Sequence, residues 1–190
     1  MGTGQCLATL EGHSDPATSV VFSPDGTRLV SASHKDTASL WPSDSETVKL
    51  WDAATGQCLT TLDIGRILYT LYFDTTGTRL HTNIGTILLD PSLTSDPMST
   101  TTSISIQPQQ PRYAGCSISR DGAWIMWNSE KLLWLPPEYR PNIKKPPYLF
   151  PMGGFASIAV AGLAVAIGCS SGRVLIFRFS PSLGKDFSIL

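Results

Sequence analysis

The chain has 190 residues, and 42% of them are hydrophobic, so it is long enough to bury a core and its composition is that of a globular protein. Its 14 basic and 15 acidic residues are mixed, and no basic stripe marks a nucleic-acid surface. The first residues lack a basic segment followed by an apolar one, so no secretory signal is predicted.

A seven-residue phrase occurs twice: residues 4–10 read Gly-Gln-Cys-Leu-Ala-Thr-Leu, and residues 56–62 read Gly-Gln-Cys-Leu-Thr-Thr-Leu. Between the copies, residues 19–23 alternate as a half-buried strand does, 24–26 (Pro-Asp-Gly) form a turn, and 29–33 form a second strand. Short strands joined by tight turns predict an antiparallel meander, which must stack on sister sheets to bury its faces.

Two segments match the pattern of the third strand of this first repeat, one ending in Trp41 and the other in Trp51. Either segment can pair in the sheet. We favour residues 46–51, because Val48 and Leu50 alternate with polar neighbours and a turn follows, which leaves the other copy as a surface loop.

The rest of the chain repeats the strand pattern less regularly. A single domain over residues 1–190 is predicted, with long loops at 91–111, rich in Ser, Thr, Pro and Gln, and at 137–151, rich in Pro. The blade-like units are expected at about 4–52, 56–90, 112–136 and 155–180.

Gly12-His13 and Trp51-Asp52 bracket the first repeat as in WD-repeat β-propellers, which the chain resembles. It is also similar to the C-terminal region of fungal NACHT and WD-repeat proteins of the heterokaryon-incompatibility type. The phrases that carry this second resemblance lie at 80–87, 121–125, 132–141 and 166–174.

The resemblance implies an all-β fold, a partial or irregular WD-repeat propeller of about four blade-like antiparallel sheets. It implies a non-catalytic protein-binding scaffold or ligand-recognition module, similar to the sensor end of fungal NLR-type proteins, with a protein or peptide as partner. No Gly-rich phosphate loop ending in Gly-Lys-Ser/Thr occurs in the chain.

The resemblance also implies a buried hydrogen-bond network that joins a histidine, a strand hydroxyl, a turn aspartate and a tryptophan within one blade. A structural network is favoured over a catalytic triad. Lys35 occupies the aspartate position and Asp36 follows one residue late, so this blade is expected to be less rigid than its relatives. The network residues are expected among His13, Ser31, Ser33, Asp36, Trp41 and Trp51.

Neither a metal site nor a cofactor is predicted. The four cysteines lack a C-x-x-C pair, and the three histidines are not spaced as ligands beside them. Reduced thiols and the missing signal predict a cytoplasmic protein. Trp124, Trp127 and Trp134 are expected to pack in strands or to anchor a peptide, and the sequence does not choose among them.

Two alternatives remain open. The uncharged stretch 149–169 is a candidate membrane span, although two buried strands joined at Gly162 are favoured. An adaptor subunit of an organelle-division or ubiquitin-ligase complex is the second alternative. Residues 4–10 are candidates to close the ring on the last sheet, and open blade edges would otherwise predict self-association.

Overall fold

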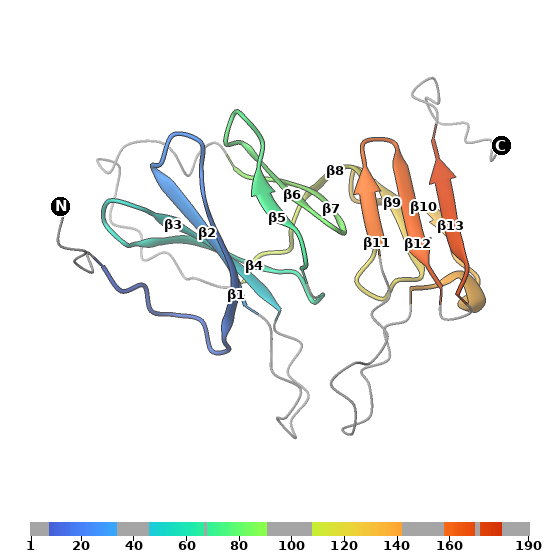
Figure 1. Ribbon diagram of the computed structural model, residues 1–190, viewed down its shortest axis with the longest axis horizontal. Helices are drawn as coiled ribbons and strands as arrows, with labels where there is room; N and C mark the ends of the chain where they lie inside the picture. The colour runs from blue at the N-terminus through green and yellow to red at the C-terminus, as the bar shows by residue number, and fades with distance from the viewer. Residues whose placement is uncertain are drawn as a thin grey trace. The chain divides into compact units, whose positions relative to one another are not determined.

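A computed structural model describes residues 8–33, 46–66, 68–90, 108–141, 158–169 and 172–179 (Figure 1). Their regular structure consists of strands β1 to β13 and one 3₁₀ turn, and the strands of each named pair run antiparallel. The expected all-β class is therefore confirmed. The chain forms two compact units, one built on β1 to β4 and the other on β6 to β13.

The first sheet has the strand order β1-β2-β3-β4. Its strands are β1 Ala17–Phe22, β2 Arg28–Ser33, β3 Thr47–Asp52 and β4 Cys58–Asp63.

The expected turn at residues 24–26 connects β1 to β2. The Ser23 hydroxyl donates to Asp25 Oδ1 over 2.6 Å, the same oxygen accepts from the Thr27 amide over 3.1 Å, and Gly26 takes a φ of 72°. A short carboxylate and a glycine thus hold the chain reversal that the sequence predicts.

The choice of third strand is settled in favour of the second copy. Strand β3 pairs with β2, and its Val48 and Leu50 side chains are buried while Thr47 and Lys49 are half-buried. Trp41 lies outside the described residues.

Strand β4 contains most of the second copy of the repeated phrase, which the sequence places at the start of the second unit. The structure pairs it with β3 instead, for example at Leu50 and Thr60. The reason is the tight turn after β3, where Asp52 Oδ1 accepts from the amide and hydroxyl of Thr55 and Gly56 has a φ of 73°. The second repeat of the sequence therefore begins with β4, which is the last strand of the first sheet.

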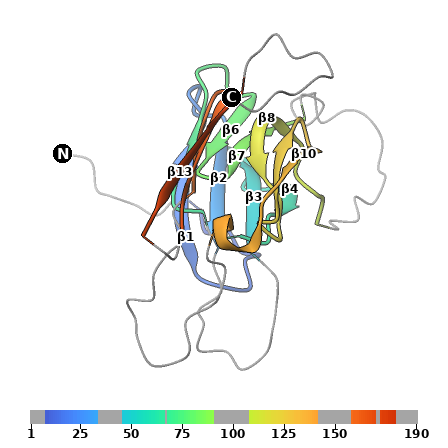
Figure 2. The ribbon, with the colours of Figure 1, turned by 90° about the vertical axis from the view of Figure 1, so that its right-hand side faces the viewer.

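The second sheet has the order β10-β9-β8-β7-β6-β5. Because β7 pairs with β8, for example at Gly85 and Ser117, the second and third expected units lie in one sheet. The 3₁₀ turn η2, Pro137–Tyr139, follows the last of its strands (Figure 2). The strands are β5 Leu71–Phe73, β6 Arg79–Thr82, β7 Gly85–Leu88, β8 Tyr113–Ile118, β9 Trp124–Trp127 and β10 Glu130–Trp134.

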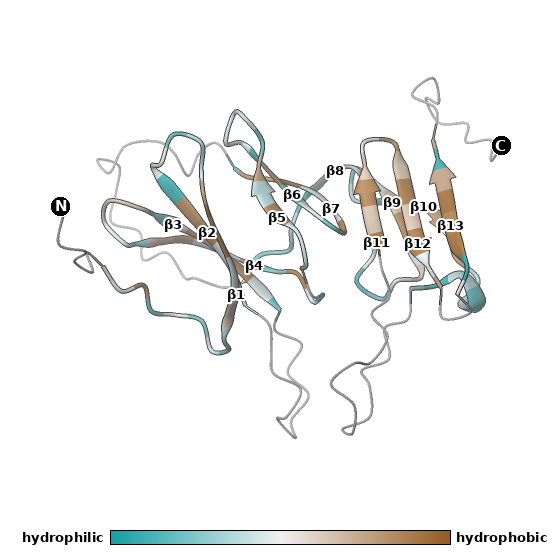
Figure 3. Ribbon diagram, in the orientation of Figure 1, coloured by the Kyte–Doolittle hydropathy of each residue, from teal (hydrophilic) through white to brown (hydrophobic). Residues whose placement is uncertain are grey.

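The third sheet consists of β11 Ile158–Ala161, β12 Ala164–Gly168 and β13 Val174–Arg178. These strands are strongly hydrophobic (Figure 3), and β11 and β12 contact β7 and β8 of the second sheet.

The membrane-span alternative is wrong for residues 158–168, since they form β11 and β12 joined at Gly162 rather than a helix. No helix among the described residues is long and apolar enough to cross a bilayer.

Branched aliphatic side chains of the central strands form the core. Val30 and Leu50 are buried in the first sheet, Leu80 and Ile125 in the second, and Val165 in the third. The buried Arg28 side chain of β2 reaches two residues outside the first sheet. Its Nη2 donates to the Gly77 carbonyl over 2.6 Å, and its Cζ lies 6.0 Å from the centre of the Phe73 ring.

We predict that Gly85→Ala weakens the junction between β7 and β8. Gly85 has a φ of 146°, and a Cβ at this position would lie 2.6 Å from Ser117 Cβ. Backbone strain and overpacking together should lower the free energy of unfolding by about 3 kcal/mol, measured by urea denaturation. The loss should be smaller when Gly85→Ala is introduced beside Ser117→Gly, and an equal loss in both backgrounds would contradict the steric explanation.

Candidate functional site

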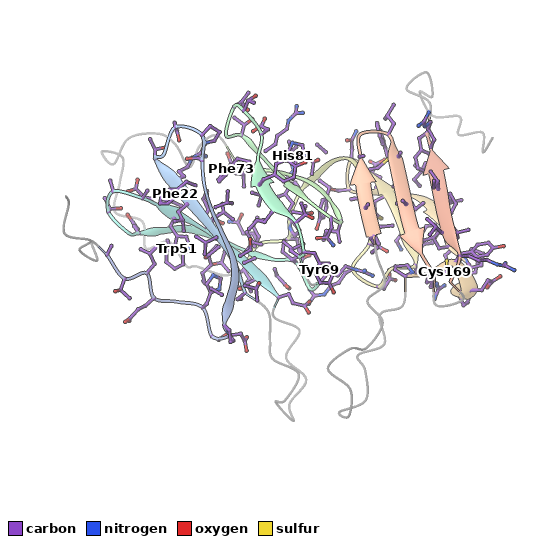
Figure 4. The ribbon with its side chains drawn as sticks, in the orientation of Figure 1. Phe22, Trp51, Tyr69, Phe73, His81 and Cys169 are labelled. Atoms are coloured by element: carbon purple, nitrogen blue, oxygen red, sulfur yellow. The ribbon has the colours of Figure 1, made fainter. Side chains whose placement is uncertain are left out.

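A hydrogen-bond network joins the segment before β1 to the middle of the first sheet. His13 Nε2 lies 2.6 Å from Ser31 Oγ on β2, and Trp51 Nε1 on β3 donates to the same oxygen over 2.8 Å. The His13 and Trp51 rings meet edge to face at 6.2 Å between centroids. Figure 4 shows Trp51 among the strands of this sheet.

The donors and acceptors give this network a direction. An indole N–H can only donate, so a Ser31 hydroxyl that accepts from Trp51 is free to donate to Nε2 of a neutral His13. The His13 proton is then on Nδ1, which lies 3.4 Å from Thr47 Oγ1, and that hydroxyl lies 3.0 Å from Ser33 Oγ.

The structure thus brings together four of the six expected network positions, His13, Ser31, Ser33 and Trp51, and adds Thr47. Asp36 and Trp41 lie outside the described residues. Thr47 was not predicted from the sequence, although strand alternation places it on the same side of β3 as Trp51.

The environment of His13 favours the neutral ring. Partial burial and then the nearby Lys49 ammonium lower the pKa of His13 from its usual 6.5, while Asp15 opposes them. Lys49 is itself held by the Thr61 hydroxyl at 2.7 Å. Because Ser31 is only 5% exposed and already accepts from Trp51, this histidine and serine are placed to stabilise the blade rather than to attack a substrate.

Within the described ranges, no group of three or more His, Cys, Asp or Glu side chains could hold a metal ion. Cys58, Cys116 and Cys169 are free thiols, and burial raises the pKa of Cys116 to about 11. A buried thiol with a raised pKa is a poor nucleophile.

An exposed surface of a different kind lies on the β9–β10 hairpin. Trp124 and Trp134 are opposite each other in the register of the two strands. Lys131 Nζ lies 5.0 Å from the centre of the Trp124 ring, and Arg140 Cζ lies 5.3 Å from that of Trp134. We call these four residues the tryptophan–cation strip.

Local hydrogen bonds hold the strip in place. The hairpin turns through Asn128 and Ser129, which have φ values of 49° and 70°. Asn128 Oδ1 accepts from the Gly115 amide over 2.7 Å, which fixes the turn to β8. Arg140 Nε donates to the Leu135 carbonyl over 2.9 Å, so the guanidinium is held beside its ring.

Among the three tryptophans that the sequence left undecided, the structure distinguishes Trp134. Its side chain is 47% exposed, whereas Trp124 and Trp127 are half-buried. Strand β10 is also at the edge of its sheet. A large, partly exposed ring beside a fixed guanidinium can pack against an apolar side chain and pair with a carboxylate.

Residues 4–42 match the family described as WD domain, G-beta repeat. The chain is 35% identical over 120 residues to the vegetative incompatibility protein HET-E-1 of Podospora anserina, and 41% identical over 66 residues to the ribosome biogenesis protein YTM1 of Phaeosphaeria nodorum. These matches cover 63% and 34% of the chain but only 7% and 12% of the two relatives. The resemblance to WD-repeat proteins and to a fungal incompatibility protein is confirmed.

Solved structures give weaker likenesses. The computationally designed Ika4 protein matches with a TM-score of 0.42 and 18% identity, over 93% of this chain and 99% of that one. The RRP9 WD40 repeats match with a TM-score of 0.34 and 11% identity, over 90% of this chain and 53% of that one.

We predict that His13 makes folding stability depend on pH. Because its pKa is lowered in the folded protein, the unfolded chain binds more protons below pH 6.5, so stability should fall as the pH decreases from about 6.5. Urea denaturation midpoints between pH 7.5 and 5 would show this, and His13→Gln should flatten that part of the curve. Parallel curves for wild type and His13→Gln would refute the assignment.

Proposed function

From a chain whose residues 4–42 match a WD repeat and whose described strands form antiparallel sheets, we propose a non-catalytic protein-binding scaffold of the WD-repeat type. The observation that carries the proposal is the tryptophan–cation strip, with Trp134 47% exposed on an edge strand. Tryptophan and arginine are the side chains most enriched at the energetic centres of protein interfaces.

The partner that fits this surface is an extended peptide with an apolar side chain next to a carboxylate. The apolar side chain would pack on Trp134, and Arg140 or Lys131 would pair with the carboxylate. Strand β10 ends its sheet, so its outer backbone groups suit a peptide that binds as an added strand. Asp121 and Glu138 lie in the same stretch of sequence and would disfavour a strongly acidic peptide.

The broader role we propose is recognition of a ligand in the manner of the sensor end of fungal NLR-type proteins. The similarity to HET-E-1 over 120 residues supports this role. We place the protein in the cytoplasm, a compartment that suits the free thiols of Cys58, Cys116 and Cys169.

We predict that Trp134→Ala and Arg140→Ala each weaken peptide binding. The full chain would be used to select binders from a random 12-residue peptide library, and the affinity of the selected peptides would be measured by fluorescence anisotropy. Loss of an exposed aromatic anchor should raise Kd about 30-fold or more, and loss of the cation should raise it less and reduce its salt dependence.

Tyr69→Ala is the matched control, because Tyr69 is an aromatic residue of similar exposure, 56%, outside the strip. This variant should bind selected peptides as wild type does. Failure to select any binder, or equal affinity of Trp134→Ala and wild type, would count against the strip as the docking surface.

A further inference from the structure

Strand β13 exposes an apolar row at the edge of the third sheet. Val174 is 69% exposed and Ile176 is 73% exposed. Ile176 is opposite Ala166, which in turn is opposite Ala159, so the same side of the sheet continues in small side chains. The other side of this sheet contains the buried Val165 and Ile167.

Strand β1 exposes a second apolar row at the edge of the first sheet. Val20 is 58% exposed and Phe22 is 59% exposed, while Val21 between them is half-buried. Figure 4 labels Phe22 on this sheet. Alternation along the strand places both exposed side chains on one face.

The two rows are complementary in size and in charge. Bulky Phe22 has its counterpart in the alanine-lined surface beside Ile176, and large side chains pack best against small ones. Asp15 and Asp25 flank β1 in the sequence, whereas Arg173 and Arg178 lie at the two ends of β13. Two β1 rows would bring carboxylates together and two β13 rows would bring guanidinium groups together, so only the unlike pairing matches the charges.

We propose that the β1 face of one chain, Val20 and Phe22, binds the β13 face of a second copy, Val174 and Ile176, in a head-to-tail contact. The faces involved are different, so the contact is heterologous, and further copies add to the free face at each end. The contact continues a packing mode that the chain already uses, since β11 and β12 of the third sheet lie against β7 and β8 of the second.

The experiment is light scattering of the full chain at several concentrations and at low and high salt. The molar mass should rise with protein concentration, and the association should weaken at high salt because the flanking charges are screened. Phe22→Asp and Ile176→Asp should each raise the apparent Kd at least tenfold and leave monomers. Tyr69→Asp, at an equally exposed site on neither face, should associate as wild type does.

A mixture of the two face variants provides the decisive measurement. Phe22→Asp keeps an intact β13 face and Ile176→Asp keeps an intact β1 face, so an equimolar mixture should form a dimer and nothing larger. Circular dichroism checks the fold of each variant, and Phe22→Ser with Ile176→Ser replaces any pair that unfolds.

Three results would overturn the proposal. A wild-type chain that stays monomeric at all concentrations would show that these faces do not bind a second copy. Association that survives in Phe22→Asp alone would indicate a contact between like faces. A mixture of the two variants that remains monomeric would show that unlike faces do not pair.

Discussion

The structure depends on one constraint: a sheet of a few strands has two faces, and its own strands cover neither of them. Each sheet therefore needs a neighbour. The third sheet covers one face by placing β11 and β12 against β7 and β8, which buries Val165 and Ile167. Beside the first sheet, Arg28 meets the Gly77 carbonyl and the Phe73 ring. The apolar rows on β1 and β13 remain exposed, because no neighbour covers these faces within the described residues.

Among the described residues, the polar network of the first sheet joins His13 to two hydroxyl groups, one of which also accepts from the Trp51 indole. Where the family resemblance implies a carboxylate beside the histidine, the described partner of His13 Nδ1 is the Thr47 hydroxyl. A neutral partner does not favour a charged ring, and burial together with Lys49 disfavours it further. The network is therefore strongest when His13 is neutral, which links the integrity of this blade to pH.

Local patterns predicted the strands well and their partners less well. Alternation of Val48 and Leu50 with polar residues identified β3, because a strand that buries one face shows this alternation in its own sequence. The sheet to which β4 belongs and the pairing of β7 with β8 depend on which strands become neighbours. The residues of a single strand do not encode its neighbour. For the same reason the sequence could not choose Trp134, since its exposure follows from the edge position of β10 rather than from its spacing. Thr47 could have been predicted from the sequence, because Ser33 and Trp51 already defined the side of the sheet on which it lies.

The two surfaces differ in chemistry, and this difference has a consequence for recognition. The tryptophan–cation strip suits one peptide and binds it through a single ring and its cations, an arrangement that gives modest affinity by itself. The β1 and β13 faces are apolar rows flanked by opposite charges and suit a rigid partner of the same kind. Head-to-tail association would add one strip with each copy, so a partner with repeated peptide segments would bind an assembly far more tightly than a monomer. The affinity of such a partner would then depend on protein concentration through the faces, while its sequence preference would depend on the strip alone.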